Sequence, residues 1–213
     1  MPELKRSYPQ VNNGGSVSYG GSQMLSERET IRKCACGPVA ALDLLLYLSG
    51  ESSDTPISLD RYNEELERLI RRYFPLLPPS GINGITLVAG LNILFIKRKL
   101  PYRAFWAVSG RKLWQRVEDM LNQDLPVILA VGPNFPAFWQ NHKLDFYVKT
   151  RDGRYVKSAA TKGHYVTATG IDDEWLQISS WGRKYYVNRS EYDSYVKKHS
   201  NFIFSNLVYL RKH

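Results

Sequence analysis

The spacing of apolar residues along the chain changes near residue 100 from a helical period to a strand-like one. Before that point, the apolar residues form helix-like segments that begin or end at Ser, Gly or Pro. After it, most segments alternate apolar and polar residues or are short apolar runs, as is typical of strands. Separate groups of helices and strands are typical of the α+β class, so we expect N-terminal helices packed on a C-terminal antiparallel sheet.

The individual segments follow from this pattern. We expect helices over residues 37–50, 58–74, 85–100, 109–123 and 190–199, the last of them capped by Ser190. We expect strands over 102–108, 126–132, 163–171, 174–181, 184–188 and 206–212, and a hairpin over 146–158. Residues 1–30 are polar and glycine-rich, and we expect an extended arm on the surface. The 213 residues suffice for one domain, which we expect to span 1–213.

The chain is basic, with a formal net charge of +9 from 29 Lys and Arg against 20 Asp and Glu. The basic residues occur as scattered pairs and triplets, so a solvated surface explains them and we expect no nucleic-acid partner. No apolar run is long enough for a membrane span, and no apolar segment typical of a signal peptide follows the basic N-terminal residues. We therefore expect a cytoplasmic protein with no membrane partner.

The two cysteines of the chain, Cys34 and Cys36, lie directly before the first apolar helix in "KCACGPVAALDLLLYLSG". They are too close in sequence to close a useful disulfide loop. The four histidines are not paired with the cysteines or with one another in a pattern that suits a metal ion. We therefore expect neither a metal site nor another cofactor.

Cys36 occupies the N-terminus of the expected helix over 37–50. Unpaired N–H groups and the helix dipole favour a thiolate there, and the thiolate is the reactive form of a nucleophilic cysteine. Gly37 allows the backbone to approach a substrate closely, and its N–H is a candidate donor for an oxyanion hole. A small buried residue at a helix entry would also fit, so Cys36 alone leaves a nucleophilic and a structural role open.

His164 begins the expected strand "HYVTATGI", directly after Gly163. A histidine at this position projects from the edge of a strand whose alternating residues hold its backbone in place. It is a candidate general base for Cys36, and a strand-capping surface histidine is the alternative.

Together these segments resemble the papain-like cysteine peptidase superfamily, and especially its bacterial branch related to the C39, bacteriocin-processing peptidases. That family combines Cys-Gly-Pro at a helix start, a Gly-His-Tyr/Phe-Val-x-x-x-Gly strand, and an Asp or Asn on the next strand. The corresponding segments here are "CGP", "GHYVTATG" and "SSWG", and the similarity extends from "YGGSQ" to the last strand. The resemblance implies a papain-like fold.

The resemblance also implies roles for individual residues. Cys36 aligns with the nucleophile and His164 with the general base. The segment "SSWG" is similar to Asn-Ser-Trp-Gly, which places Ser179 where an Asn or Asp orients the histidine. A serine accepts the imidazole N–H but does not stabilise an imidazolium as a carboxylate does. A Cys-His dyad, substitution by Asp172 or Asp173, and loss of catalysis therefore remain open.

Two further residues follow from the resemblance. The family's oxyanion glutamine often lies six residues before the cysteine, where this chain has Thr30. Gln23 lies thirteen residues before Cys36, and it would reach the oxyanion hole if the intervening segment bulges outward; a surface polar residue is the alternative. Trp181 would shield the histidine side of the cleft, which is compatible with a core position.

The function that the resemblance implies is hydrolysis of a peptide or amide bond in a peptide or protein substrate. Cys36 would form a thioester while His164 transfers the proton. Amidase, deamidase and transglutaminase chemistry uses the same parts. The alternative from another class is a catalytically impaired papain-like module that binds a peptide or protein partner.

Overall fold

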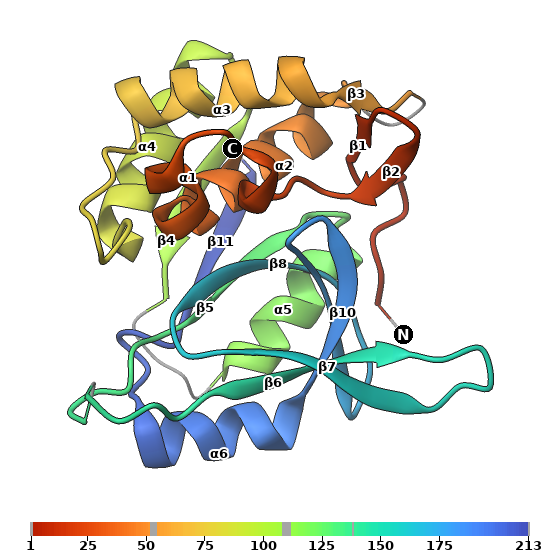
Figure 1. The fold of residues 1–213 in the computed structure, drawn as a ribbon, viewed down its shortest axis with the longest axis vertical. Helices are drawn as coiled ribbons and strands as arrows, with labels where there is room; N and C mark the ends of the chain where they lie inside the picture. Colours follow the sequence, from red (N-terminus) through yellow and green to blue (C-terminus); the bar gives the residue numbers. More distant parts are fainter. Residues whose placement is uncertain (1, 52–54, 108–111, 138, 213) are drawn as a thin grey trace.

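The computed structural model describes residues 2–51, 55–107, 112–137 and 139–212, and it shows a helical part next to a strand-rich part (Figure 1). The helices are α1 (Glu29–Cys34), α2 (Cys36–Ser49), α3 (Leu59–Arg72), α4 (Gly84–Lys97), α5 (Leu113–Asn122) and α6 (Arg189–His199). In Figure 1, α1 to α4 lie in the upper half of the molecule, and α6 lies at its lower end.

The main sheet is antiparallel, with the strand order β4-β11-β5-β8-β9-β10-β6-β7. Its strands are β4 (Tyr102–Trp106), β5 (Val127–Val131), β6 (Leu144–Lys149), β7 (Tyr155–Thr161), β8 (His164–Ile171), β9 (Trp175–Ser180), β10 (Arg183–Asn188) and β11 (Leu207–Lys212). A large antiparallel sheet beside separate helices confirms the predicted α+β class. The expected end of the strand over 102–108 and the start of the helix over 109–123 fall partly outside the described residues.

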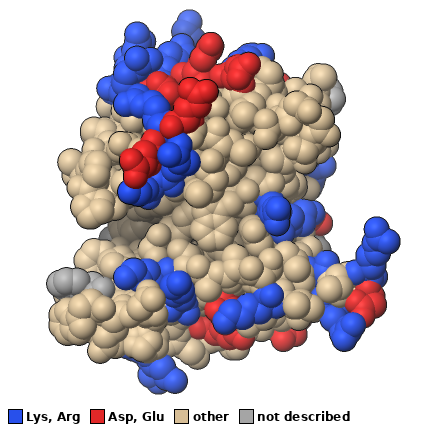
Figure 2. Space-filling model, in the orientation of Figure 1, with Lys and Arg blue, Asp and Glu red and all other residues tan. Residues whose placement is uncertain are grey.

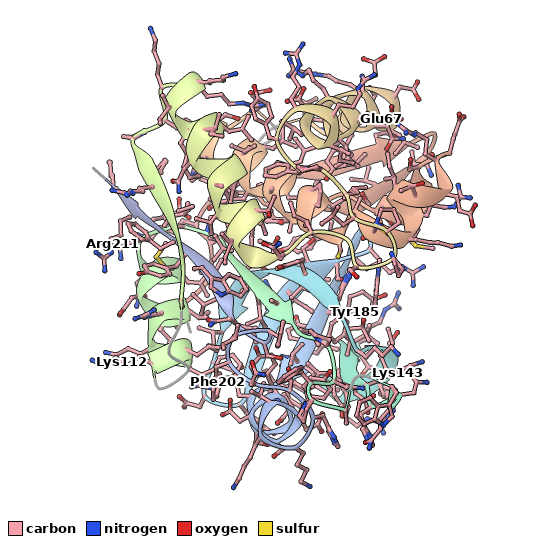
Figure 3. All side chains as sticks on the ribbon, turned by 90° about the vertical axis from the view of Figure 1, so that its left-hand side faces the viewer. Glu67, Lys112, Lys143, Tyr185, Phe202 and Arg211 are labelled. Carbon is pink, nitrogen blue, oxygen red and sulfur yellow. The ribbon has the colours of Figure 1, made fainter. Side chains whose placement is uncertain are left out.

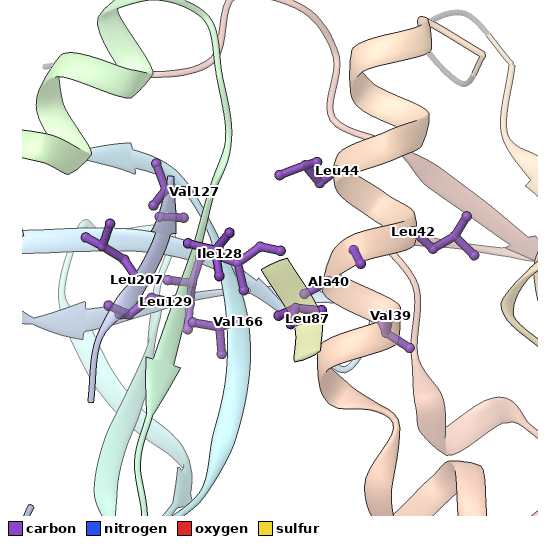
Figure 4. Close-up of a cluster of buried hydrophobic side chains, with 14 of the residues drawn as sticks. Val39, Ala40, Leu42, Leu44, Leu87, Val127, Ile128, Leu129, Val166 and Leu207 are labelled. Carbon is purple, nitrogen blue, oxygen red and sulfur yellow. The ribbon is translucent and has the colours of Figure 1, made fainter. Parts of the chain in front are cut away.

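Helix α2 is the most deeply buried helix of the described residues because it is apolar on nearly every side. It ends at Gly50, whose φ of 73° is a left-handed conformation that glycine adopts without strain. Figure 4 shows a cluster of buried apolar side chains on this helix, on α4 and on neighbouring strands of the sheet. They are Val39, Ala40, Leu42 and Leu44 of α2, Leu87 of α4, Val127, Ile128 and Leu129 of β5, Val166 of β8 and Leu207 of β11. The core therefore holds the N-terminus of α2 in a defined position relative to β8.

Polar caps set the starts of the surface helices. The Ser58 hydroxyl accepts a hydrogen bond from the Arg61 N–H at the start of α3. Helix α6 is capped by Asn188, whose side-chain oxygen accepts from the N–H groups of Ser190 and Glu191. The predicted cap at Ser190 is therefore wrong, because the Asn188 side chain satisfies these first N–H groups and places the cap two residues earlier.

The first 30 residues are more than an extended surface arm. Their strands β1 (Gln10–Asn13) and β2 (Ser16–Tyr19) form a hairpin, and β1 also pairs in parallel with β3 (Ile57–Ser58). Tyr8 and Val11 are buried, with 4% and 1% of their surface exposed. The N–H of Leu4 also bonds to the carbonyl oxygen of Thr169, so the arm runs along β8. Tyr8 and Val11 become buried because the hairpin packs against the helices and the sheet, whereas Val17 and Met24 stay exposed.

Charged side chains of both signs share the surface. Figure 2 shows Lys and Arg interspersed with Asp and Glu on the upper part of one face. Several of them form ion pairs, including Arg28 with Glu67 at 3.2 Å. In the side view of Figure 3, Glu67 lies at the helical end of the molecule and Phe202 near α6. Among the helices of the described part of the chain, none has both the length and the apolar character that crossing a bilayer requires.

Candidate active site

A small pocket lies where the start of α2 meets the start of β8, the end of β9 and the segment before α1. Cys36, His164, Ser180, Trp181 and Gln23 all contribute to its lining. These residues come from segments that are far apart in the sequence, and the packing of α2 against β8 brings them together.

Cys36 is the first residue of α2 and is half-buried. Gly37 has no room for a side chain, because an added Cβ would lie 2.5 Å from Cγ2 of Ile82 and 3.2 Å from the Tyr165 ring. Burial raises the pKa of the Cys36 thiol, and the backbone N–H groups of Tyr165 and Gly37 only partly oppose this change. The pKa of Cys36 is therefore raised, whereas the sequence led us to expect that the helix N-terminus would favour a thiolate.

His164 is the first residue of β8 and is buried, with 8% of its surface exposed. Its Nε2 lies 2.8 Å from the Ser180 hydroxyl oxygen. The Trp181 indole stacks on the imidazole at 4.5 Å between ring centroids. Burial lowers the pKa of His164 to about 3, because the charged imidazolium is poorly solvated there. His164 is therefore a neutral imidazole at neutral pH, held from one side by a hydroxyl and from another by an aromatic ring.

The hydroxyl beside His164 is that of Ser180, not that of Ser179 as the motif alignment predicts. The Ser179 hydroxyl donates instead to the carbonyl oxygen of Tyr19 at 2.9 Å. Successive side chains of a strand point to opposite faces, so adjacent serines cannot both face the imidazole. Aligning the motif one residue further along the chain is therefore enough to place Ser180, and not Ser179, beside the imidazole.

The two aspartates considered as substitutes are remote from the imidazole. Asp172 follows the last residue of β8, whereas His164 is the first, and eight extended residues span roughly 26 Å. The Asp172 carboxylate accepts hydrogen bonds from the N–H groups of Glu174 and Trp175 in the turn between β8 and β9. Asp173 belongs to the same turn. Both aspartates therefore lie at the far end of β8.

Gln23 is buried and begins the 3₁₀ helix Gln23–Leu25. Its side-chain Nε2 donates to the carbonyl oxygen of Arg32 at 2.8 Å. A primary amide has two N–H donors, so this bond orients the Gln23 amide and leaves its second N–H as a donor for another group. Thr30, by contrast, is an exposed residue of α1. The segment between Gln23 and Cys36 folds into short helices, and this folding brings Gln23 to the pocket.

A buried carboxylate also lines the pocket, and it was not among the predicted site residues. Asp43 is the single charged residue of α2 and is buried, with 2% of its surface exposed. It follows Cys36 by seven residues, about two helical turns, and so lies on the same face of the helix. A lone carboxylate within an apolar helix was the signal in the sequence that pointed to it.

Cys34, His142 and His199 do not line the pocket that contains Cys36. Cys34 is buried, and its thiol donates to the carbonyl oxygen of Pro79 at 3.7 Å. The His142 and His199 rings stack on each other at 3.8 Å. Within the described ranges, no three or more His, Cys, Asp or Glu residues gather in a way that would hold a metal ion.

Comparisons with known proteins identify the fold. No family model matches the chain, and a search of curated proteins finds no match. A search of solved structures finds a Bacillus anthracis protein, described provisionally as a C39-like peptidase, that aligns over 100% of this chain and 98% of its own. The TM-score is 0.51 and the sequence identity 15%. The two chains share a fold.

The shared fold agrees with the resemblance seen in the motifs. The functional groups of the pocket point to a chemistry independently of that likeness. A thiol and a neutral imidazole line this pocket, and these are the residue types that serve as nucleophile and base in acyl transfer. The N–H groups at the start of α2 and the Gln23 amide are donors at the same pocket. The residues present therefore match the parts that cysteine-dependent acyl transfer needs.

Proposed function

We propose that this protein is a cysteine-dependent hydrolase of the papain-like, C39-related type that cleaves a peptide or amide bond in a peptide or protein. A single observation carries the proposal: the imidazole of His164, held by Ser180 and Trp181, shares a pocket with Cys36 at the start of α2. The likeness in fold to a protein described as a C39-like peptidase supports the choice of a peptidase over other acyl-transfer enzymes.

In the proposed mechanism, both Cys36 and His164 are neutral before substrate binds. Sγ of Cys36 attacks the carbonyl carbon while its proton passes to the imidazole. The tetrahedral intermediate then collapses, the carbon–nitrogen bond breaks, and the imidazolium gives its proton to the departing amine. Water activated by His164 attacks the resulting thioester, which releases the acid and restores the thiol.

The oxyanion of the tetrahedral intermediate needs preorganised donors. We assign this role to backbone N–H groups at the start of α2, including that of Gly37, and to the second N–H of the Gln23 side chain. Ser180 holds the imidazole with one neutral hydrogen bond, which stabilises the imidazolium less than a carboxylate would. We therefore expect slow turnover compared with an enzyme that has an orienting carboxylate.

A peptidyl electrophile, such as a vinyl sulfone library with varied side chains, tests the proposal by mass spectrometry. We expect covalent labelling of Cys36 in the wild type and in Cys34→Ser, and a loss of tenfold or more in labelling rate in His164→Ala. The Cys34→Ser variant is the matched control, because Cys34 is bound to the Pro79 carbonyl outside the pocket. Labelling of Cys36 at a rate independent of His164 contradicts the proposal.

A non-catalytic peptide-binding module is the second candidate. It is favoured by the hydroxyl of Ser180 at the position where a carboxylate or amide would strengthen the base. Under this alternative, a peptide that binds with measurable affinity is recovered intact, and Cys36→Ala leaves the affinity unchanged. Product formation that depends on Cys36 rejects it.

A further inference from the structure

Asp43 is a buried carboxylate to which the proposed mechanism gives no role. It is an acidic residue in the middle of the apolar helix α2 and is buried. In the described part of the chain, no Lys, Arg or His forms an ion pair with it. Burial of an unpaired carboxylate is unfavourable, and here it raises the pKa of Asp43 to about 7.

The hydrogen bonds of Asp43 lead toward the N-terminal segment. The Gly21 N–H lies 3.0 Å from one carboxylate oxygen and 3.1 Å from the other. The Tyr62 hydroxyl donates to the carboxylate at 2.8 Å and the Tyr8 hydroxyl at 3.3 Å. The carboxylate thus joins α2, α3 and the segment around Gly21 at one point.

The chain around Gly21 passes too close to its neighbours to carry side chains. A Cβ on Gly21 would overlap the Tyr62 hydroxyl, and one on Gly20 would lie 2.6 Å from the Asp43 carboxylate. The backbone of this segment is also bound to the sheet, since the Tyr19 N–H donates to the carbonyl oxygen of Gly182 at 2.9 Å. Gly20 and Gly21 are therefore seated between α2 and the end of β9.

Gln23 follows Gly21 by two residues, a reach of at most about 7 Å. Ser22, between them, is buried. A displacement of Gly21 would therefore be transmitted to the Gln23 amide in the pocket.

We propose that Asp43 is a positioning residue that, by accepting the Gly21 N–H, holds the Gln23 amide at the oxyanion side of the Cys36 pocket. This inference rests on the role that the proposed function gives to Gln23. A purely structural Asp43 would stabilise the fold without any selective effect on Gln23.

Amide resonances of protein labelled with ¹⁵N at Gly and Gln test the positioning without any need for substrate. We expect Asp43→Leu to shift the Gly21 amide and the Gln23 side-chain amide, and Asp43→Asn, which keeps one acceptor oxygen, to leave both close to their wild-type positions. Tyr8→Phe is the matched control, because it removes one hydrogen bond to Asp43 but leaves the Gly21 contact. An unchanged Gln23 side-chain amide in a folded Asp43→Leu variant overturns the inference.

Kinetics on a substrate or on the electrophile that labels Cys36 give the second readout. We expect Asp43→Leu to lower kcat, or the labelling rate, about tenfold to a hundredfold, with little change in KM. Because Asp43 acts through Gln23, the same change in a Gln23→Ala background is expected to cost less than about twofold. Losses that multiply in the double variant overturn the inference.

Two precautions keep the outcomes distinct. If Asp43→Leu does not fold, Asp43→Ala takes its place, since the smaller side chain leaves room for water beside Tyr8 and Tyr62. If no variant and no wild-type protein reacts at Cys36, the proposed function fails. The amide resonances then still decide whether Asp43 positions Gln23.

Discussion

At the scale of single residues, burial sets the protonation states in the pocket. The same desolvation that raises the pKa of Cys36 lowers that of His164 to about 3. Both changes favour the uncharged forms, so a resting thiolate–imidazolium pair is not expected. The imidazole remains a base at any pH well above 3.

The pH dependence of Cys36 alkylation by iodoacetamide tests this arrangement. We expect the rate to rise with an apparent pKa at or above the free-thiol value of about 8.5, because burial favours the protonated thiol. We also expect the ratio of the wild-type rate to the His164→Ala rate not to fall between pH 8 and pH 5, because His164 stays neutral over that range. A plateau of fast alkylation with an apparent pKa below about 6 would instead indicate an ion pair.

The protonation of Asp43 makes the stability of the fold depend on pH, and this contribution falls as the pH rises. Its pKa in the folded protein is raised to about 7 from 3.8, so between these values the folded state holds a proton that the unfolded state has lost. This contribution to stability is fully present below the unfolded pKa and is lost as the pH rises through about 7.

We expect the free energy of unfolding of the wild type, relative to Asp43→Asn, to fall by up to about 1.4 kcal/mol per pH unit between pH 4 and pH 7. Urea unfolding of both proteins at several pH values measures this difference. His164 titrates in both proteins, so the difference isolates Asp43. Parallel pH profiles would show that the Asp43 carboxyl has an ordinary pKa.

At the scale of the elements, the end of β9 determines which serine faces the histidine. Ser180 contacts the imidazole, and Ser179 is bound to the Tyr19 carbonyl. The two residues share a strand and a chemistry and differ in the face to which they point. They therefore form a natural pair of test and control.

We expect Ser180→Ala to lower kcat about fivefold, because one neutral hydrogen bond to the base is worth about 1 kcal/mol. We expect Ser179→Ala to leave kcat within about twofold and to lower the free energy of unfolding by about 1 kcal/mol. Steady-state kinetics and urea unfolding of both variants measure these effects. A larger loss of kcat in the Ser179 variant would return the orienting role to that residue.

At the scale of the whole molecule, α2 and the sheet share one core. Leu42 and Leu44 of α2 are fully buried, as are Ile128 and Leu129 of β5. A Leu→Ala change in such a core typically costs about 2–5 kcal/mol. The helical and strand-rich parts are therefore expected to depend on each other for stability.

We propose that the chain is a single domain and expect one cooperative unfolding transition. Two independent probes are available, because all five tryptophans lie after residue 100, whereas most of the helical residues lie before it. Tryptophan fluorescence and far-ultraviolet circular dichroism should give coincident urea curves. Two separated transitions would show two independently folding units.

Local patterns in the sequence were sufficient to predict much of this architecture. The α+β class, the helix that starts near Cys36 and the strand that starts at His164 depend on hydrophobic period, on Gly and Pro and on turn residues, all of which act within a few positions. Such signals are readable because they concern neighbours in the chain.

Contacts between distant segments depended on packing. Ser180 meets His164 across neighbouring strands, Gln23 reaches the pocket through the folding of the segment before Cys36, and Asp43 finds its partners in α3 and the N-terminal segment. The pKa directions belong to this group as well, because desolvation is a property of the assembled core. A linear pattern shows which residue types are present, but which face each one points to and how much water it loses are set only when the elements pack.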